Sequence, residues 1–387
     1  MADLLDYMTR RRDEMVTLLQ GLVEHESPTA HTPEEKAYSD RLAEYLAGII
    51  AGYGAEVERI PQAIRGDHLV ARWGHGARPV LILAHYDTVW PLGTLREMPF
   101  SQAHGRLRGP GIFDMKGGLV LALFALRALR ELGRLGGPVT LLVNSDEEVG
   151  SLTSRDLIES EARRSRAALV VEPAQPPNAA LKTSRKGVGR FSLRVIGKPA
   201  HSGWVAEQGV SAVEELARQV VELYGLADIP KGTTVNVGVV RGGTRANVVA
   251  AEAEADIDVR VTNHDEARRI TEAILGLSPF NPDAKLIIEG GLNRPPMERT
   301  SGTVALLDIA RRVGTDMGLN ITESSSGGGS DGNFTSALGV PTLDGLGVVG
   351  GGAHAHDEHT LLDHLAPRAA LLAAIIEAVA RDEGLSL

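Results

Sequence analysis

Three short, predominantly apolar runs in the first half of the chain constrain its fold more than any other feature. They are Pro79–Ala84, Val139–Val143 and Ala168–Val171. Continuous apolar runs of this length are typical of strands buried on both faces, as the strands of a parallel sheet are. A helix-like segment from Gly118 to Leu132, with Gly133 as its C-terminal cap, separates the first two runs. This rhythm predicts an α/β fold in which helices cover both faces of a mostly parallel sheet.

The pattern changes near residue 186, and the chain of 387 residues is too long for one ordinary hydrophobic core. Strand-like and helix-like segments then follow in the order β-α-β-β-α-β, which is the order of a ferredoxin-like unit. These segments cover residues 189–196, 206–224, 233–240, 247–261, 264–277 and 284–289.

The two ends of the chain carry the helix and strand patterns of the larger domain. Helical periodicity covers residues 3–20 and 33–52, and after Pro296 a strand at 341–346 and a helix at 366–382 are expected. We therefore predict one α/β domain interrupted by a smaller α+β domain. The three segments are residues 1–185, the first part of the α/β domain, 186–295, the inserted domain, and 296–387, the second part.

The composition argues against several classes of protein. The chain has no cysteine, so neither disulfide bonds nor thiolate metal sites can form. Its net charge of −10 argues against a nucleic-acid partner, which usually leaves a basic patch. The stretch MADLLDYMTRRRDEM lacks the apolar segment of a signal peptide, and Arg127 and Arg130 interrupt the most apolar helix-like stretch. We expect a soluble cytoplasmic protein without a membrane partner.

Each of the three apolar runs is followed by residues that can carry chemistry. His85 and Asp87 follow the first run, Glu147 and Glu148 the second, and Glu172 the third. Open α/β sheets bind ligands at the C-terminal ends of their strands, so these side chains are candidates for one site. Polar strand ends, or acids that start the next helix, are the plain alternatives. Neighbouring strand residues point to opposite faces, so Glu147 and Glu148 should have different roles.

Two loops add further candidates. Asp114 lies in the Gly/Pro-rich turn Gly109–Gly118, where capping the following helix is its alternative role. The segment Gly351–His359 contains several histidines and could instead be a solvated polar loop. Imidazole and carboxylate ligands without thiolates suit zinc, cobalt or manganese. Such a set can hold two metal ions if one carboxylate bridges them.

With these motifs the chain resembles the dinuclear zinc metallopeptidases that include glutamate carboxypeptidase, aminoacylase and succinyl-diaminopimelate desuccinylase. The motifs H-Y-D-T-V, G-P-G-I-F-D-M-K-G-G, S-D-E-E-V-G-S, V-E-P and G-G-G-A-H match this family in type and order. The resemblance covers nearly the whole chain. Glutamate carboxypeptidase is the most similar branch, because V-E-P supplies a glutamate where some relatives use an aspartate.

The resemblance implies two Zn²⁺ ions, with Co²⁺ or Mn²⁺ as alternatives, and a role for each candidate residue. The implied metal ligands are Asp114 as the bridge, His85 and Glu172 at one ion, and Glu148 and His354 at the other. The spacing to Glu358 favours His354 as the ligand, and His356 is the alternative. Asp87 would orient His85, and Glu147 would be the general base that deprotonates a metal-bridging water. A cis peptide bond after Asp114 is also implied.

The inserted domain resembles the dimerisation domain of the same family. In Gly197–Gly203 the resemblance implies that His201 reaches the partner subunit's active site and stabilises an oxyanion. It also implies substrate contacts from Asn247, Arg260 and Arg294, although a domain-linker salt bridge is the alternative for Arg294. The loop Gly328–Asp331, with Gly329 and Ser330, resembles one that gives backbone donors to a substrate carboxylate.

Together these features predict a metal-dependent hydrolase that cleaves an amide or peptide bond next to a C-terminal free carboxylate. The expected substrate is a small N-acyl amino acid or peptide, and the expected assembly is a homodimer through the inserted domain. An aminoacylase or N-acyl-diamine deacylase is the alternative within the family. A non-catalytic relative would be expected to lack a ligand or Glu147, and all are present. The inserted unit and the His201 motif argue against a zinc aminopeptidase.

Overall fold

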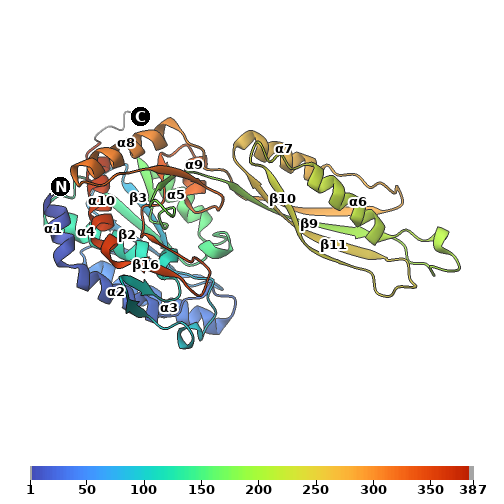
Figure 1. Ribbon diagram of the computed structural model, residues 1–387, viewed down its shortest axis with the longest axis horizontal. Helices are drawn as coiled ribbons and strands as arrows, with labels where there is room; N and C mark the ends of the chain where they lie inside the picture. Colours follow the sequence, from blue (N-terminus) through green and yellow to red (C-terminus); the bar gives the residue numbers. More distant parts are fainter. Residues whose placement is uncertain (1, 383–387) are drawn as a thin grey trace. The chain divides into compact units, whose positions relative to one another are not determined.

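The computed structural model describes residues 2–382, which form two compact units (Figure 1). Among the described residues, the first unit contains those from 2 to 184, Arg299–Ser326 and those from 330 to 382. The second unit contains Arg185–Glu298 and the short segment Gly327–Gly329. None of the helices in the described residues is long and apolar enough to cross a membrane.

A six-stranded sheet forms the centre of the first unit. Its strands, in spatial order, are β1 (Glu56–Ile60), β2 (His68–Trp73), β6 (Val139–Asn144), β3 (Val80–His85), β7 (Ala167–Val170) and β14 (Thr342–Leu343). Strands β6, β3, β7 and β14 are parallel, whereas β1 and β2 are antiparallel to their neighbours. The mainly parallel sheet confirms the fold class predicted from the apolar runs.

Helices cover both faces of this sheet because consecutive residues of a strand face opposite sides. Val80, Ile82 and Ala84 of β3 join the large core, and Leu81 and Leu83 join a smaller one. The large core is closed by α1 (Ala2–Arg10), α2 (Arg12–Glu24), α3 (Pro33–Gly52), α4 (Gly117–Glu131), α8 (Ser301–Asp316) and α10 (Leu362–Ala380). The smaller core is closed by α5 (Arg155–Arg164) and α9 (Gly332–Ala337).

Short strands and helical turns lie outside the six-stranded sheet. Strands β8 (Leu181–Arg185) and β13 (Glu323–Ser326) form a pair. A small four-stranded sheet contains β4 (Ser101–Ala103), β5 (Arg106–Arg108), β15 (Gly350–Gly351) and β16 (His359–Leu361). Short helical turns are η1 (Thr94–Arg96), η2 (Ile112–Lys116) and η3 (Glu147–Val149). The first expected helix, residues 3–20, is instead two helices that break at Arg11, and the expected strand 341–346 is shorter.

The second unit is a four-stranded antiparallel sheet with two helices on one face. Its elements, in chain order, are β9 (Gly187–Ile196), η4 (Ala206–Gln208), α6 (Ala212–Gly225), β10 (Thr234–Gly242), β11 (Glu252–Val261), α7 (His264–Leu275) and β12 (Lys285–Arg294). The spatial order is β10-β11-β9-β12. Alternating strand residues such as Leu193 and Ile257 pack under the helices, and Arg194 and Glu254 lie on the open face.

Candidate metal centre

Five of the predicted side chains gather at the C-terminal edge of the parallel strands. His85 ends β3, Glu148 follows β6, Glu172 follows β7, and two loops supply Asp114 and His354. The C-terminal edge of an open parallel sheet is the usual ligand-binding edge of α/β folds. The structure therefore brings together residues as far apart in the sequence as His85 and His354.

Asp114 lies between the two histidines, and each of its oxygens faces a different one. Oδ1 is 3.4 Å from His85 Nε2, and Oδ2 is 3.4 Å from His354 Nε2. Glu172 Oε1 is 3.4 Å from His85 Nε2, and Glu148 Oε2 is 3.2 Å from His354 Nε2. The carboxylate of Asp114 is therefore shared by two imidazole–carboxylate pairs.

The loop that carries Asp114 is held by the buried carboxylate of Glu358. This carboxylate accepts hydrogen bonds from the backbone N–H groups of Gly111, Phe113 and Asp114 at 2.9, 2.9 and 3.1 Å, and from the Trp90 indole at 2.8 Å. The peptide bond between Asp114 and Met115 is cis, as the family resemblance implied. Sequence reasoning used Glu358 only for its spacing to His354 and missed this role.

Asp87 connects the two sides of the centre. It is fully buried, and its carboxylate lies 3.3 Å from His85 Nδ1. The same carboxylate accepts hydrogen bonds from Thr29 Oγ1 at 2.7 Å and from the backbone N–H groups of Glu147 and Glu148 at 3.2 and 3.3 Å. One side chain thus orients His85 and also fixes the start of the turn that carries both glutamates.

Asp146, the third acid of the stretch, has a local structural role. Its carboxylate is fully buried and accepts hydrogen bonds from Thr153 N and Thr153 Oγ1 at 2.6 and 2.9 Å, and from Ser154 Oγ at 2.6 Å. These bonds close the loop between β6 and α5, so the three acids point to three different surroundings. His356 lies against the Trp90 ring, with ring centroids 5.4 Å apart.

The electrostatics of the centre follow from packing carboxylates around two imidazoles. Burial alone lowers the pKa of His85, but its contacts with Asp114, Asp87 and Glu172 raise the pKa well above its ordinary value. Asp114 and Glu148 raise the pKa of His354 to about 10. Burial raises the pKa of Glu148 to about 7. Burial also acts to raise the pKa of Asp114, but His354 and His85 lower it overall. The packed carboxylates thus favour a positive charge, either a proton or a cation, among these side chains.

The donors of this cluster fit a metal ion. Ligand atoms of His85, Asp114 and Glu148 lie within 4.8 Å of one another, and so do those of His85, Glu147 and Glu172. Buried polar atoms are normally hydrogen-bonded, yet His85 Nε2 and Glu148 Oε1 have no such partner among residues 2–382. A cation coordinated by these two atoms would account for both, and imidazole with carboxylate suits the zinc group of metals.

Apart from Ser330, the other predicted site residues lie near the two ends of the second unit's sheet. At one end, Val188 of β9 pairs with both Arg260 and Arg294, and the stem of Arg294 lies beside Gly329. At the opposite end, His201 forms an isolated β-bridge with Val248. Ser330 belongs to the first unit, where its hydroxyl donates to Asp344 at 2.6 Å.

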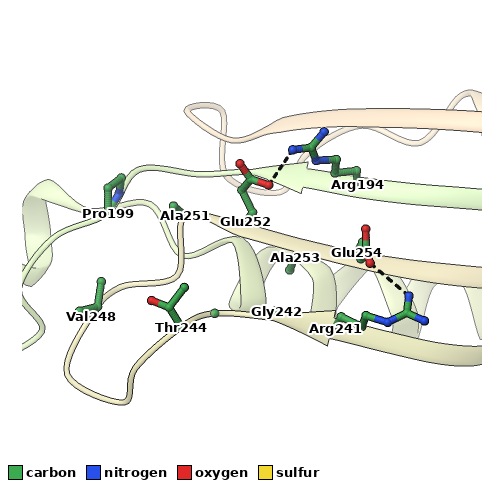
Figure 2. Close-up of a pocket in the computed structure, with 11 residues that line it drawn as sticks. Arg194, Pro199, Arg241, Gly242, Thr244, Val248, Ala251, Glu252, Ala253 and Glu254 are labelled. Carbon is green, nitrogen blue, oxygen red and sulfur yellow. Dashed lines mark hydrogen bonds and ion pairs between the residues drawn. The ribbon is translucent and has the colours of Figure 1, made fainter.

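The His201 end of this sheet borders a groove of ≈ 470 Å³ (Figure 2). Figure 2 shows two ion pairs among its lining residues, Arg194 with Glu252 at 2.6 Å and Arg241 with Glu254 at 3.1 Å. Asn247 lies in the loop after β10, and its carbonyl accepts a hydrogen bond from Ser202 N at 3.2 Å. Residues 247–249 therefore contact the His201 segment and do not extend β11, contrary to the expected strand 247–261.

Comparison with known proteins identifies relatives over most of the chain. The family model "Peptidase family M20/M25/M40" matches residues 81–378. The chain is 29% identical to carboxypeptidase G2 of Pseudomonas sp. (strain RS-16) over 356 residues, 89% of this chain and 84% of that protein. It is also 29% identical to acetylornithine deacetylase of Edwardsiella ictaluri (strain 93-146) over 272 residues, 65% of this chain and 69% of that protein.

Solved structures share the fold along nearly the full length. Aminopeptidase PepT from Bacillus cereus ATCC 10987 superimposes with a TM-score of 0.77 at 22% identity, over 95% of this chain and 99% of that one. The M20 family metallo-carboxypeptidase Sso-CP2 from Sulfolobus solfataricus gives a TM-score of 0.71 at 18% identity, over 94% and 98%. The chain therefore belongs to peptidase family M20/M25/M40 and is a metal-dependent hydrolase of the carboxypeptidase or deacetylase kind.

Proposed function

We propose that the protein hydrolyses an amide or peptide bond adjacent to a free C-terminal carboxylate, in the manner of a glutamate carboxypeptidase. The observation that carries this proposal is the position of Asp114 between His85 and His354, with Glu147 close to the same cluster. The similarity to carboxypeptidase G2 over 89% of the chain supports the reaction class.

Two metal ions, taken as Zn²⁺, would be held by the five clustered side chains. His85 and Glu172 are assigned to one ion, Glu148 and His354 to the other, and Asp114 to both. When bound, such ions acidify water and polarise a carbonyl oxygen. Asp87 keeps His85 in the orientation that presents Nε2 to the cluster.

Glu147 is assigned as the general base. Its carboxylate lies within 4.8 Å of the ligand atoms of His85 and Glu172, which supports a role beside the metal ligands. Distance alone would also allow a ligand role, but Asp114 and Glu172 already present oxygens to His85. Glu147 takes a proton from the attacking water as the new C–O bond forms and the carbonyl oxygen becomes an oxyanion. It then delivers this proton to the amine nitrogen as the C–N bond breaks and the carbonyl re-forms.

His201 is assigned to the active site of a partner subunit, where it stabilises the oxyanion. Strand β9 has ten residues and so extends roughly 30 Å at about 3.3 Å per residue. Arg260 and Arg294 pair with Val188 at one end, and the His201 loop follows the other. A small substrate cannot contact both ends of one sheet, so His201 and the two arginines of one chain serve different sites.

A homodimer through the second unit is therefore part of the proposal. Strand β10 is an edge strand of its sheet, and Val240 on it is 57% exposed. The adjacent helix α6 exposes Val213, Val221 and Tyr224 along one side. Edge strands with exposed apolar residues pair readily with a second chain. Mixing the inactive variants His201→Ala and Glu147→Gln tests this assembly, because a mixed dimer restores one complete site.

The main alternative is a deacylase of the same family that acts on other N-acyl amino acids. The similarity to acetylornithine deacetylase favours it. An aminopeptidase is a further alternative, because the PepT aminopeptidase structure matches 95% of this chain. The inserted unit, which was expected to argue against an aminopeptidase, therefore does not separate the two classes.

A substrate panel decides between these reactions. N-acyl amino acids and dipeptides that vary the C-terminal residue are assayed with Zn²⁺, Co²⁺ and Mn²⁺. Preference for a C-terminal glutamate with a free carboxylate is the expected result. Equal cleavage of substrates whose carboxylate is amidated would overturn the carboxypeptidase assignment, and preference for acetylated diamines would establish the deacylase.

A further inference from the structure

We propose that Arg185 is the positioning residue for the part of the site that binds the substrate's free carboxylate. This inference rests on the proposed function and adds a specificity determinant to it. Arg185 is only 3% exposed, and its backbone pairs in both directions with Met297 at 3.0 Å. Its guanidinium donates from Nη1 to the carbonyl oxygens of Gly328 and Gly329 at 3.2 and 3.1 Å.

These two bonds determine where the neighbouring N–H group points. The peptide unit is planar and trans, so the N–H of Gly329 is directed opposite to the carbonyl of Gly328. That carbonyl is bound to Arg185, so the Gly329 N–H points away from Arg185. The described part of the chain supplies no hydrogen-bond acceptor to this N–H. It is available to a ligand.

The donors of the next residue are already engaged. The Ser330 N–H donates to Asn333 Oδ1 at 2.9 Å, and the Ser330 hydroxyl donates to Asp344 Oδ2 at 2.6 Å. Of the two loop residues expected to contact substrate, Gly329 therefore offers the open backbone donor. Ser330 contributes by fixing the end of the loop.

Arg294 lies directly beside this donor. A Cβ atom on Gly329 would come within 2.7 Å of Arg294 Cδ and 3.7 Å of Arg294 Nε. The backbone of Gly329 therefore packs on the stem of Arg294, and only glycine permits this approach. A carboxylate can accept from a guanidinium and a backbone N–H together, and hydrogen bonds to a charged acceptor are the strong ones. An amide in the same position lacks the charge.

The sequence of this loop explains why it needs an external support. Gly327, Gly328 and Gly329 are consecutive, and a run of glycines loses the most conformational entropy on ordering. Arg185 removes this freedom before the substrate arrives, since it holds two successive carbonyls. The carboxylate then binds a donor that is already oriented, which lowers the cost of binding.

The test compares an N-acyl glutamate with its α-amide in the holoenzyme. For Arg185→Met we expect KM for the free acid to rise about 10- to 100-fold with little change in kcat, which corresponds to a loss of about 1.4–2.7 kcal/mol of binding. The kcat/KM for the α-amide should stay within about threefold, so the preference for the free acid collapses. Arg185→Lys, which can reach one carbonyl, should give an intermediate preference.

Lys186→Met is the matched control, because Lys186 is the neighbouring cation and donates to Gly232 O at 2.6 Å, in a different segment of the chain. It should keep the wild-type preference. The inference is overturned if kcat/KM falls equally for the free acid and the α-amide in the Arg185 variants, or if the preference for the free acid is unchanged. If Arg185→Met does not fold, the result for Arg185→Lys decides. If the wild-type enzyme itself lacks the preference, it is the proposed function that fails.

Discussion

The carboxylate of Asp87 accepts a hydrogen bond from the backbone N–H of Glu147 at 3.2 Å. Asp87 also lies 3.3 Å from His85 Nδ1, so one buried acid orients a proposed ligand and anchors the proposed base. Two ends of parallel strands are thereby coupled through a single side chain. A change at Asp87 should affect metal binding and catalysis together.

Asp87→Ala should weaken Zn²⁺ binding by up to about 10-fold, because His85 Nδ1 loses the carboxylate at 3.3 Å but keeps its hydrogen bond to the backbone carbonyl of residue 87 at 3.0 Å. Turnover at saturating metal should also fall, because the Glu147 turn loses its anchor. Metal titration and steady-state kinetics measure the two effects. Thr29→Val is the matched control, since it removes one donor to Asp87 and leaves the carboxylate. Unchanged affinity in Asp87→Ala would contradict this role.

Glu147→Gln and Glu148→Gln should separate the two adjacent acids. Glu147→Gln should keep its metal and lose about 10²- to 10⁴-fold in turnover, the range for removing a general base. Glu148→Gln should lose metal, because Glu148 Oε2 lies against His354. Metal analysis of both purified variants, with activity, distinguishes them. If Glu147→Gln loses metal as Glu148→Gln does, Glu147 is a ligand and the proposed mechanism is wrong.

Local sequence patterns predicted the strand ends, and the strand ends carry most of the candidate site. The apolar runs before His85, Glu147 and Glu172 are β3, β6 and β7 in the structure. The side chains after them meet because parallel strands end at the same edge. The alternation argument for Glu147 and Glu148 does not apply, because β6 ends at Asn144 and both residues lie in the 3-10 turn η3. The two side chains still have different surroundings, and the role proposed for each comes from the resemblance to a family.

Contacts between distant segments could not be predicted in this way. The break between α1 and α2 at Arg11 coincides with an ion pair from Arg11 to Glu131, 120 positions away. Glu358 holds a loop 244 to 247 positions earlier. The sequence offered one hint: a buried acid needs several hydrogen-bond donors, and the Gly/Pro-rich turn Gly109–Gly118 contains backbone N–H groups that a regular helix or strand would not use.

Glu358→Gln should destabilise the protein by about 1–3 kcal/mol, because the amide turns a donor toward backbone N–H groups that need an acceptor. The Asp114 loop should also move, so metal affinity should fall in the same variant. Urea unfolding of the metal-free protein measures the first effect. Trp90→Phe removes only the indole donor to Glu358 and should cost less. Equal stability of Glu358→Gln and wild type would show that the loop does not depend on this carboxylate.

Gly118→Ala should destabilise the protein by about 3 kcal/mol or more through steric overlap. A Cβ at this position would lie 1.9 Å from the carbonyl oxygen of Val171, so α4 could not approach the end of β7. Gly48→Ala is the matched control, because Gly48 is an exposed position of α3 with no atom within 4 Å of the new methyl group. It should stabilise the protein by about 0.5–1 kcal/mol. Thermal and urea unfolding of both variants test the pair.

Acid should destabilise the second unit through Glu266. Hydrogen bonds from Arg269 and Thr233 lower the pKa of Glu266 from 4.5 to about 2. The folded state therefore favours the charged carboxylate, so its stabilisation is fully present above pH 4.5 and is lost as the pH falls towards 2. In Glu266→Gln the urea midpoint should be lower at pH 6 and should change less between pH 4.5 and 2.5. Glu272→Gln, at an exposed position of α7, is the control and should follow the wild type. An identical pH dependence in Glu266→Gln and wild type would contradict the linkage.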